Sequence, residues 1–377
     1  MTVIDAPWLN DKAAQQVCSV LTDAGYQAWF VGGCVRNAIL DAPVADLDLS
    51  TDAHPDIVTK LAKAAGLSVI PTGIEHGTVT IIAENVPFEV TTFRRDVATD
   101  GRRATVAFAD NMVDDARRRD FTMNALYVGP DGVVVDPLGG LPDLFARRVR
   151  FIEDADQRIK EDYLRILRYF RFHAWYGAMD EGPDPDALAA CAENIEGLQT
   201  LSAERVTSEL LKLLFAPNPA PSVASMASTG GLAQVLPGAN AGMLAVLVHV
   251  EGQAAMHPDP IRRLAVLGGD VSALRLSKDE GKRLKNMHSD LSLNEQGYRF
   301  GHQAALDYLA VQAASLGQEI DPNNVKLANF SSEQVFPLKA ADLMPNLQGP
   351  ALGQALKNAE ARWIASGFTL TKADLLE

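Results

Sequence analysis

Hydrophobic residues recur with two different spacings along the first 145 residues. Short apolar runs between turn-forming residues predict strands at 29–31, 46–49, 78–82 and 88–92 and a hairpin at 125–135. Apolar residues spaced three or four apart predict helices that begin at residue 10 or 11 and cover 35–40 and 56–65. This part of the chain is therefore predicted to be a small domain of mixed helices and strands.

After residue 145 the strand patterns fade and helical spacing takes over. One long helix is predicted at 157–175, with a buried stripe that includes Ile159 and Tyr163. Ser202 can cap a further helix, which ends before the proline-rich stretch 216–221. The pattern predicts an α+β fold, in which a small sheet domain precedes a longer, all-helical region.

Length and composition place the chain among ordinary globular proteins. Its 377 residues are too many for one core, and 47% of them are hydrophobic and 22% charged. The apolar run at 241–250 is too short to span a membrane, and residues 1–10 show no secretory signal. The three scattered cysteines, Cys18, Cys34 and Cys191, fit a reduced, cytoplasmic protein without a zinc site. We therefore expect no membrane partner, and nothing in the sequence specifies an oligomeric state.

The net charge of −14 argues against a general nucleic-acid-binding protein, because phosphate contacts need local positive charge. Basic residues nevertheless gather at 94–103, at 117–119 and at 275–285. The last cluster consists of Arg275, Lys278, Lys282, Arg283 and Lys285. Solvated surface charge and contacts to RNA phosphates both remain open for each cluster.

Two adjacent glycines, Gly32 and Gly33, separate the first predicted strand from the helix that follows it. Such a turn lets the backbone approach a phosphate closely, and a helix N-terminus favours an anion. Arg36 lies in the first turn of the helix and can add charge-assisted hydrogen bonds. A plain turn is the alternative interpretation of the two glycines alone.

Asp46 and Asp48 are two positions apart on a predicted strand, so both side chains face the same way and the Cα atoms are about 7 Å apart. Their carboxylates can then converge on two metal ions about 4 Å apart. A solvent-facing strand edge is the alternative, but the position shortly after the glycine turn favours metal binding. Glu89, on a later predicted strand, can supply a third carboxylate or simply lie at the surface.

Two further segments carry candidate nucleotide ligands. Residues 118–125 join two arginines, which can bind a triphosphate, to Asn124, which can bind a ribose hydroxyl; a capped helix with exposed arginines is the alternative. Asp162 and Arg165 are three apart on the long predicted helix, and spacing alone favours an ordinary ion pair between them. A carboxylate beside a guanidinium also matches the amine and ring acceptor of cytosine or adenine, but not uracil or guanine.

The order of these motifs resembles the class II tRNA nucleotidyltransferase and bacterial poly(A) polymerase family. The motifs lie at 32–36, 46–48, 118–125, 136–140 and 161–165, and the resemblance continues weakly through 202–212. It covers about the first 215 residues. The family often has aspartate after the arginine of the glycine motif, where this chain has Asn37, so one charge near the phosphates is absent.

The resemblance implies a nucleotidyltransferase head at 1–145, a helical neck at 146–215 and a helical body and tail at 216–377. It implies that Asp46 and Asp48 bind Mg²⁺. It also implies that Asp162 and Arg165 read the base as a protein template. The residues that it assigns to the nucleotide are Gly32, Gly33, Arg36, Arg118, Asp120, Asn124, Asp162 and Arg165.

Such enzymes use CTP and ATP to rebuild the CCA at the tRNA 3′ end without a nucleic-acid template, by in-line displacement of pyrophosphate. A poly(A) polymerase is the nearest alternative, but its relatives tend to be basic and to carry a Gly-Arg-Arg-Phe-like segment where this chain has 89–94. CC-adding relatives lack a loop resembling Asp100–Arg103, which is present here. A noncatalytic RNA-binding module would not need both aspartates. No adjacent His-Asp pair supports an appended phosphohydrolase.

Overall fold

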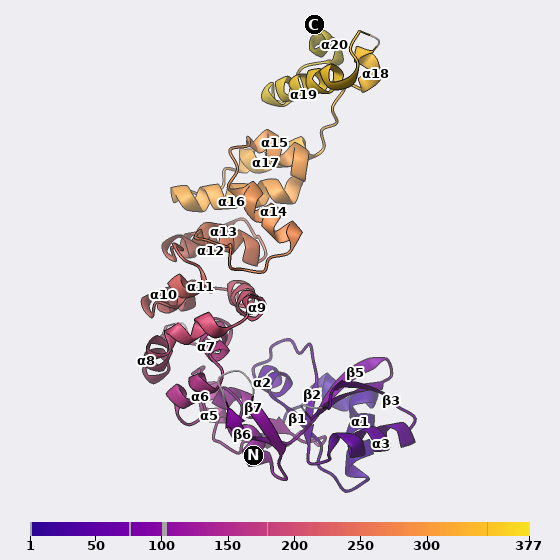
Figure 1. The fold of residues 1–377 in the computed structure, drawn as a ribbon, viewed down its shortest axis with the longest axis vertical. Helices are drawn as coiled ribbons and strands as arrows, with labels where there is room; N and C mark the ends of the chain where they lie inside the picture. Colours follow the sequence, from indigo (N-terminus) through magenta and orange to yellow (C-terminus); the bar gives the residue numbers. More distant parts are fainter. Residues whose placement is uncertain (1, 75–76, 100–103, 179, 345) are drawn as a thin grey trace. The chain divides into compact units, whose positions relative to one another are not determined.

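The computed structural model describes residues 2–74, 77–99, 104–178, 180–344 and 346–377 (Figure 1). The fold is α+β, as predicted, because every strand in the described residues precedes residue 136 and helices follow. The strands are β1 (Trp29–Val31), β2 (Asp48–Thr51), β3 (Ser68–Gly73), β4 (Thr78–Ala83), β5 (Val86–Thr92), β6 (Arg94–Thr99), β7 (Ala104–Phe108), β8 (Tyr127–Val128) and β9 (Val134–Val135).

Seven strands form one mixed sheet in the order β3-β4-β5-β2-β1-β8-β9, while β6 and β7 form a separate pair. Within the large sheet, β2 and β5 are parallel, with Asp48 opposite Glu89. The neighbouring pair β1 and β2 is antiparallel, with Phe30 opposite Leu49. The end of β1 therefore lies next to the start of β2, which brings the glycine turn close to Asp48.

Short helices accompany this sheet. They are η1 (Pro7–Asn10), α1 (Lys12–Thr22), α2 (Gly33–Ile39), α3 (Pro55–Ala64), α4 (Met112–Arg117), η3 (Thr122–Asn124) and α5 (Leu141–Phe145). The predicted start of α1 is confirmed, because the Asp11 carboxylate accepts hydrogen bonds from the Ala13 and Ala14 N–H groups. Ala13, Val17 and Leu21 are buried along one face of this helix, as its apolar spacing predicted.

Two features of the predicted strands are wrong. The strand predicted at 46–49 begins at Asp48, because pairing with β5 starts there, and Asp46 lies in the preceding loop. The sequence also missed β3, β6 and β7. In β3, Pro71 interrupts the strand pattern, and most side chains are exposed because this strand lies at the edge of the sheet.

The prediction of one continuous helix at 157–175 is also wrong, because two helices occupy this range. α6 (Ala155–Glu161) ends at Asp162, whose extended backbone (φ −156°, ψ 104°) breaks the helix, and α7 (Leu164–Tyr176) then begins. Tyr163 packs against Gly197, where a Cβ atom would lie only 2.0 Å from the ring atom Cδ1. Asp162 and Arg165 therefore do not share one continuous helix.

The remaining helices complete the chain. They are α8 (Pro185–Glu193), η4 (Ile195–Thr200), α9 (Ala203–Leu214), α10 (Ala220–Ser228), α11 (Gly231–Val235), α12 (Gly242–Gln253), α13 (Pro260–Leu267), α14 (Lys278–Met287), α15 (Leu293–Phe300), α16 (His302–Leu316), α17 (Pro322–Ser332), α18 (Ala340–Leu343), α19 (Gly349–Ala365) and α20 (Lys372–Leu376). The chain forms two compact units. The first contains residues 1–206 and 225–235, and the second contains 207–224 and 236–377.

The second unit contains a buried network of charges beside an apolar core. Arg262 and Arg263 are each 1% exposed, and both donate hydrogen bonds to the Glu251 carboxylate. Arg262 also pairs with Asp307 at 2.8 Å, and Arg263 donates to the carbonyl oxygen of Leu214 at 2.6 Å. These contacts satisfy charges that would otherwise be costly to bury.

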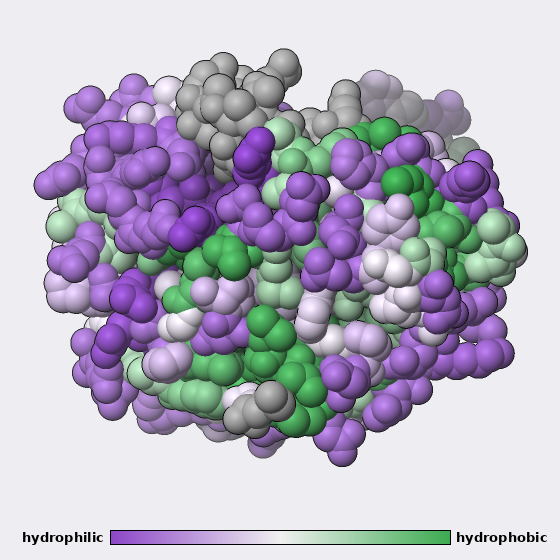
Figure 2. All heavy atoms as spheres, turned by 90° about the horizontal axis from the view of Figure 1, so that it is seen from below, coloured by the Kyte–Doolittle hydropathy of each residue, from purple (hydrophilic) through white to green (hydrophobic). Residues whose placement is uncertain are grey.

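The face of the molecule shown in Figure 2 is mostly hydrophilic, with hydrophobic side chains gathered in smaller areas between the polar ones. Among the described residues, no helix has the length and hydropathy that a membrane span requires. The three free cysteines are all buried.

Candidate active site

The glycine turn requires glycine at one position and lies beside a carboxylate. Gly32 has φ 74°, in the left-handed region that favours glycine, and α2 begins at Gly33. Cys34 follows Gly33, and its thiol is close enough to the Asp48 carboxylate to feel the negative charge. Burial and then the charge of Asp48 raise the pKa of Cys34 to about 11. The turn and the start of β2 therefore form one local site.

Arg119 supplies positive charge to this site. Its Nη1 atom lies 3.4 Å from the place where a Cβ at position 32 would be, so its guanidinium faces the turn. It is held by the Asp115 carboxylate at 2.9 Å and contacts the Ser50 hydroxyl at 3.4 Å. The resemblance assigns the neighbouring Arg118 to the nucleotide, but Arg119 is the arginine beside the turn. Its i,i+4 spacing from Asp115 was the sequence signal for this anchoring.

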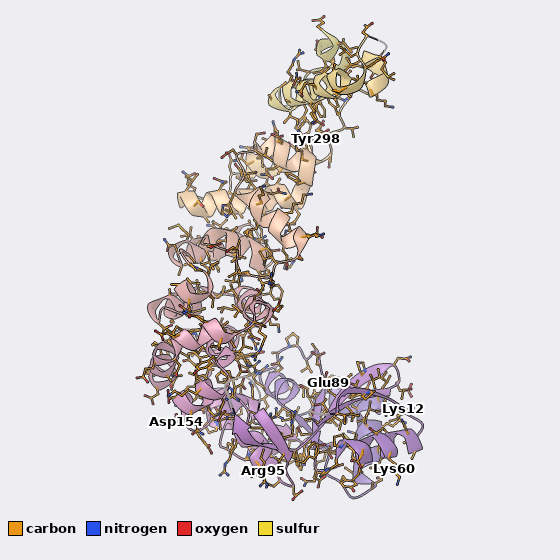
Figure 3. The ribbon with its side chains drawn as sticks, viewed as in Figure 1. Lys12, Lys60, Glu89, Arg95, Asp154 and Tyr298 are labelled. Carbon is orange, nitrogen blue, oxygen red and sulfur yellow. The ribbon has the colours of Figure 1, made fainter. Side chains whose placement is uncertain are left out.

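Asp46, Asp48 and Glu89 are the carboxylates near the start of β2. Glu89, labelled in Figure 3, is the register partner of Asp48 on β5. Desolvation and then the negative charges of Glu89 and Asp46 raise the pKa of Asp48, while Arg119 partly lowers it. Although Asp46 lies outside the strand, it is therefore close enough to influence Asp48.

Carboxylate oxygens are the donors that hard divalent cations prefer, and a bound cation would relieve the repulsion among these three groups. The donor set therefore fits a magnesium ion. In the described part of the chain, however, no three potential ligands already stand together in the arrangement of a metal site.

The Arg36 guanidinium is buried and bonded to other side chains, rather than exposed and available to bind a phosphate. It is 6% exposed, and its guanidinium lies 3.9 Å from the centre of the Tyr176 ring. It donates hydrogen bonds to the Tyr176 hydroxyl at 2.7 Å, to the Asn124 side-chain oxygen and to Asn37. Asn37 in turn donates to the Pro43 carbonyl at 2.7 Å, a bond that aspartate lacks the proton to make.

Asp120 and Asn124 form one connected group with Arg36. The Asn124 amide nitrogen donates to Asp120 at 2.8 Å, so its side-chain orientation is set from both ends. Arg168 on α7 donates to the other oxygen of Asp120 at 2.8 Å. Burial opposes ionisation of Asp120, but Arg168 and the Asn124 amide together lower its pKa. The carboxylate therefore stays charged and links this segment to α7.

The two residues of the expected base template have separate partners. Asp162 pairs with Arg205 at 2.7 Å, and its other oxygen accepts from the Leu164 N–H group at 3.1 Å. Arg165 pairs with Glu161 at 2.6 Å. The simple ion pair between Asp162 and Arg165 that the spacing favoured is therefore wrong, because the helix break turns the two side chains to different neighbours.

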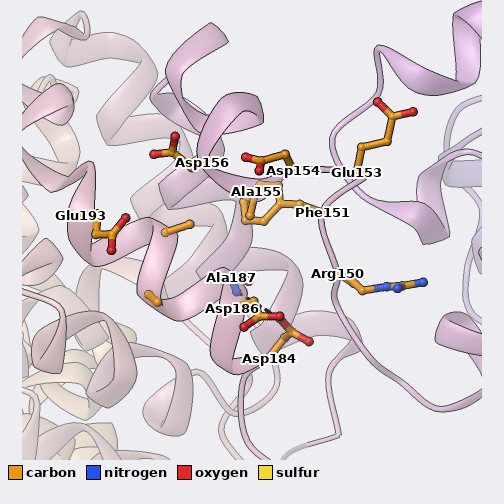
Figure 4. Close-up of a pocket in the computed structure, with 12 residues that line it drawn as sticks. Arg150, Phe151, Glu153, Asp154, Ala155, Asp156, Asp184, Asp186, Ala187 and Glu193 are labelled. Carbon is orange, nitrogen blue, oxygen red and sulfur yellow. Dashed lines mark hydrogen bonds between the residues drawn. The ribbon is translucent and has the colours of Figure 1, made fainter.

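Two pockets lie near these residues. Arg118 and Glu161 line one of about 270 Å³, together with Arg95, Asp114, Arg117, Glu153 and Arg158. A second pocket, of about 440 Å³, lies beside α6 and α8 and is strongly acidic (Figure 4). Its charged lining residues are Arg150, Glu153, Asp154, Asp156, Asp184, Asp186 and Glu193. Its excess of carboxylates makes it unsuitable for phosphate, whereas the smaller pocket has a mixed lining in which arginines outnumber carboxylates.

The basic cluster of the second unit is only partly available to a ligand. Arg283 donates to Asp259 and Asp307 at 2.8 and 2.7 Å, so two carboxylates already neutralise it. The side chains of Lys278, Lys282 and Lys285 on α14 are exposed. The lysines, rather than Arg283, are therefore the candidates for contacts with phosphate.

Two family models match parts of the chain and indicate its class. Residues 28–150 match the family model described as "Poly A polymerase head domain". Residues 183–243 match the model described as "Probable RNA and SrmB- binding site of polymerase A". The sheet, the glycine turn and the three carboxylates all lie in the first match, which defines this part as a nucleotidyltransferase head.

Relatives that match over most of their own length define the family. The mitochondrial CCA tRNA nucleotidyltransferase 1 of Danio rerio is 32% identical over 93% of this chain and 86% of its own length. The CCA-adding enzyme of Limosilactobacillus fermentum is 33% identical over 92% of this chain and 90% of its own length. The chain belongs to the class II tRNA nucleotidyltransferase family of CCA-adding enzymes.

Other matches are shorter or structural. The human mitochondrial CCA tRNA nucleotidyltransferase 1 is 44% identical, but the matched part is 55% of this chain and about half, 48%, of that protein. A solved structure of the Bacillus stearothermophilus CCA-adding enzyme in complex with CTP has a TM-score of 0.74, with 27% identity over 96% of this chain and 94% of that one.

Proposed function

We propose that this protein adds C, C and A from CTP and ATP to the 3′ end of tRNA, without a nucleic-acid template and with release of pyrophosphate. The observation that carries the proposal is the pairing of Asp48 with Glu89 directly beside a glycine turn that faces Arg119. This arrangement supports the proposal, because carboxylates that can bind a metal ion lie close to a turn that can admit a phosphate. The buried free cysteines are consistent with a reducing cytoplasm.

In the reaction, the oxygen of the RNA 3′-hydroxyl forms a bond to the α-phosphorus of the triphosphate. The bond from that phosphorus to the oxygen leading to the β-phosphate breaks, pyrophosphate leaves with that oxygen, and the hydroxyl proton passes to water. Mg²⁺ bound by Asp46 and Asp48, with Glu89 as a third donor, would supply stabilisation of the developing negative charge. Gly32 and Gly33 admit the triphosphate, and Arg119 neutralises part of its charge.

The rest of the site orients the nucleotide. Asn124 offers its amide to the ribose, and Asp120 and Arg36 hold that amide in place. Arg118, which lines the pocket of about 270 Å³, would add a guanidinium to the nucleotide contacts. Asp162 accepts from the exocyclic amine of C or A, and Arg165 donates to the ring acceptor beside it.

The function is tested by incubating the purified protein with tRNAs that lack A, CA or CCA and supplying each triphosphate separately. A CCA-adding enzyme extends each substrate only with the next correct nucleotide and then stops. Continued addition of A indicates a poly(A) polymerase, and extension of only some substrates indicates a CC- or A-adding enzyme. No extension of any tRNA contradicts enzymatic function.

The loop Asp100–Arg103, which lies outside the described residues, is expected to matter more for the final A than for the two Cs. The expectation rests on the matching loop of full CCA-adding relatives. Deleting the four residues should yield tRNA that ends in CC, which gel analysis of the extended 3′ ends can detect. Equal losses of C and A addition would reject this role.

Replacing Lys278, Lys282 and Lys285 together by alanine is expected to weaken tRNA binding. Log affinity falls as log salt concentration rises, and each phosphate contact that is lost should make this slope shallower by roughly 0.7–0.9. Binding titrations from low to moderate salt measure both quantities. Arg283→Ala is the comparison variant, because its guanidinium pairs inside the unit and its loss should mainly reduce stability. A triple variant with unchanged affinity and slope would argue against contact with tRNA.

A further inference from the structure

Arg158 is a buried arginine that is not among the expected site residues. It lies on α6, one turn before the helix break, and is 6% exposed. A buried guanidinium needs partners within the protein, because burying an unpaired charge is costly. Its partners therefore show which parts of the structure depend on it.

The Arg158 guanidinium joins two parts of the site. It donates to the Glu161 carboxylate and to the backbone carbonyl of Arg118, and it reaches the carbonyl of Arg119 at 2.6 Å. The carbonyls belong to the segment that supplies the arginine beside the glycine turn. Glu161 belongs to the segment that supplies the base template.

Arg165 uses the same anchors. Its Nη1 donates to the Glu161 carboxylate at 2.6 Å and to the backbone carbonyl of Arg158 at 2.5 Å. Its Nη2 donates to the carbonyl of Arg118 at 3.2 Å. The two arginines therefore share one carboxylate oxygen, Oε2 of Glu161, and one carbonyl oxygen, that of Arg118. The direction of the Arg165 guanidinium depends on groups that Arg158 holds.

We propose that Arg158 is a positioning residue for base selection, which fixes Glu161 and the carbonyls of residues 118–119 so that Arg165 presents its donors in one direction. This inference rests on the proposed function, in which Arg165 reads the base. Selection requires that a wrong base leave polar groups unpaired. If the Arg165 side chain can turn away from a wrong base, that penalty disappears and the wrong base is incorporated faster. The rate with a correct base falls less, because only one hydrogen bond is weakened.

A purely structural role makes a different prediction. If Arg158 only ties α6 to residues 118–119, its loss lowers thermal stability and slows all nucleotides by the same factor. The ratio of correct to incorrect incorporation then stays at the wild-type value. This ratio is therefore the measurement that separates positioning from stability.

The variants are Arg158→Met, which keeps the apolar stem, and Arg158→Lys, which keeps the charge but not the fork of donors. Lys160→Met is the matched control, because Lys160 lies on the same helix and pairs with Asp156 at the surface, at 2.7 Å. Each full-length variant is given tRNA lacking CCA with CTP or UTP, and tRNA lacking A with ATP or GTP. The values of kcat/KM are measured well below the melting temperature of each variant.

We expect Arg158→Met to lower the ratios of CTP to UTP and of ATP to GTP by about tenfold or more, which corresponds to about one lost mismatch penalty. Arg158→Lys should fall between this variant and the wild type, and Lys160→Met should keep the wild-type ratio. If Arg158→Met does not fold, Arg158→Lys decides by the same ratio. Wild-type ratios in every folded Arg158 variant overturn the inference. A wild-type protein that adds neither C nor A instead overturns the proposed function.

Discussion

Replacing Asp48 by asparagine or alanine is expected to abolish the incorporation of both CTP and ATP. Asp48 lies at the centre of the three carboxylates, with Glu89 opposite in register and Asp46 nearby in the preceding loop. A metal ion held there contributes several kcal/mol of transition-state stabilisation, so its loss should cost about a thousandfold or more in rate. Asp46→Ala is expected to have the same effect.

The fold should survive the change at Asp48. The raised pKa of Asp48 means that the folded state disfavours its ionised form. The ionised carboxylate therefore lowers the free energy of unfolding. This cost is absent below the unfolded pKa of about 4, grows as the pH rises towards the folded pKa, and is fully present above the folded pKa. Asparagine carries no charge, so at pH 7 Asp48→Asn should melt at or above the wild-type temperature.

Single-turnover incorporation with magnesium, together with thermal melting, checks both expectations. Asp56→Ala is the control, because Asp56 is an exposed carboxylate in the first turn of α3. Near-normal turnover by Asp48→Asn would show that the metal assignment is wrong.

Asp162→Ala is expected to lose base selectivity as well as rate. The carboxylate accepts from the amine of C or A but offers no proton to the carbonyl of U or G, and Arg165 repels their ring N–H. Each mismatch leaves a polar group unpaired, at roughly 1–3 kcal/mol. Two mismatches give discrimination of about a hundredfold or more, since about 1.4 kcal/mol is tenfold. Incorporation of UTP and GTP should therefore rise relative to CTP and ATP, and Arg165→Ala should show the same change.

Arg205→Ala provides the matched control, because it breaks the ion pair with Asp162 and leaves the carboxylate in place. A role confined to this pair predicts the same behaviour from Asp162→Ala and Arg205→Ala, with a small loss of stability and unchanged base choice. Relative incorporation of all four triphosphates distinguishes the two roles. Strict preference for C and A in both Asp162→Ala and Arg165→Ala would place the selector elsewhere.

The sequence predicted the regular elements well where each segment follows one spacing. The start of α1 at Asp11 and the strands β4 and β5 correspond to their apolar patterns. The break at Asp162 escaped prediction because apolar spacing continues across it. What ends α6 is tertiary, since Asp162 pairs with Arg205 and Tyr163 fits against Gly197, both more than thirty positions away.

The site was predictable as a set of residues, but its contacts were not. Asp48 and Glu89 were both selected from their strands, yet only the parallel pairing of β2 and β5 makes them neighbours. The sequence could not separate Arg119 from Arg118, because each arginine has an aspartate four positions before it, Asp115 and Asp114 respectively. Arg283 likewise resembled its lysine neighbours until the fold placed Asp259 and Asp307 against it.

The buried charges around Glu251 constrain how the second unit can change by mutation. Losing Arg262, Arg263 or Asp307 singly strands a buried charge, at about 3–5 kcal/mol, whereas replacing a whole buried charge set by well-packed apolar residues is often neutral or stabilising. Each of these single losses therefore lowers the free energy of unfolding, even where an apolar core in place of the whole network would be at least as stable. Evolution by single substitutions would therefore tend to retain these residues, because each first step is destabilising. Protein engineering that replaces all of them together could raise the thermal stability of this unit and leave the catalytic head unchanged.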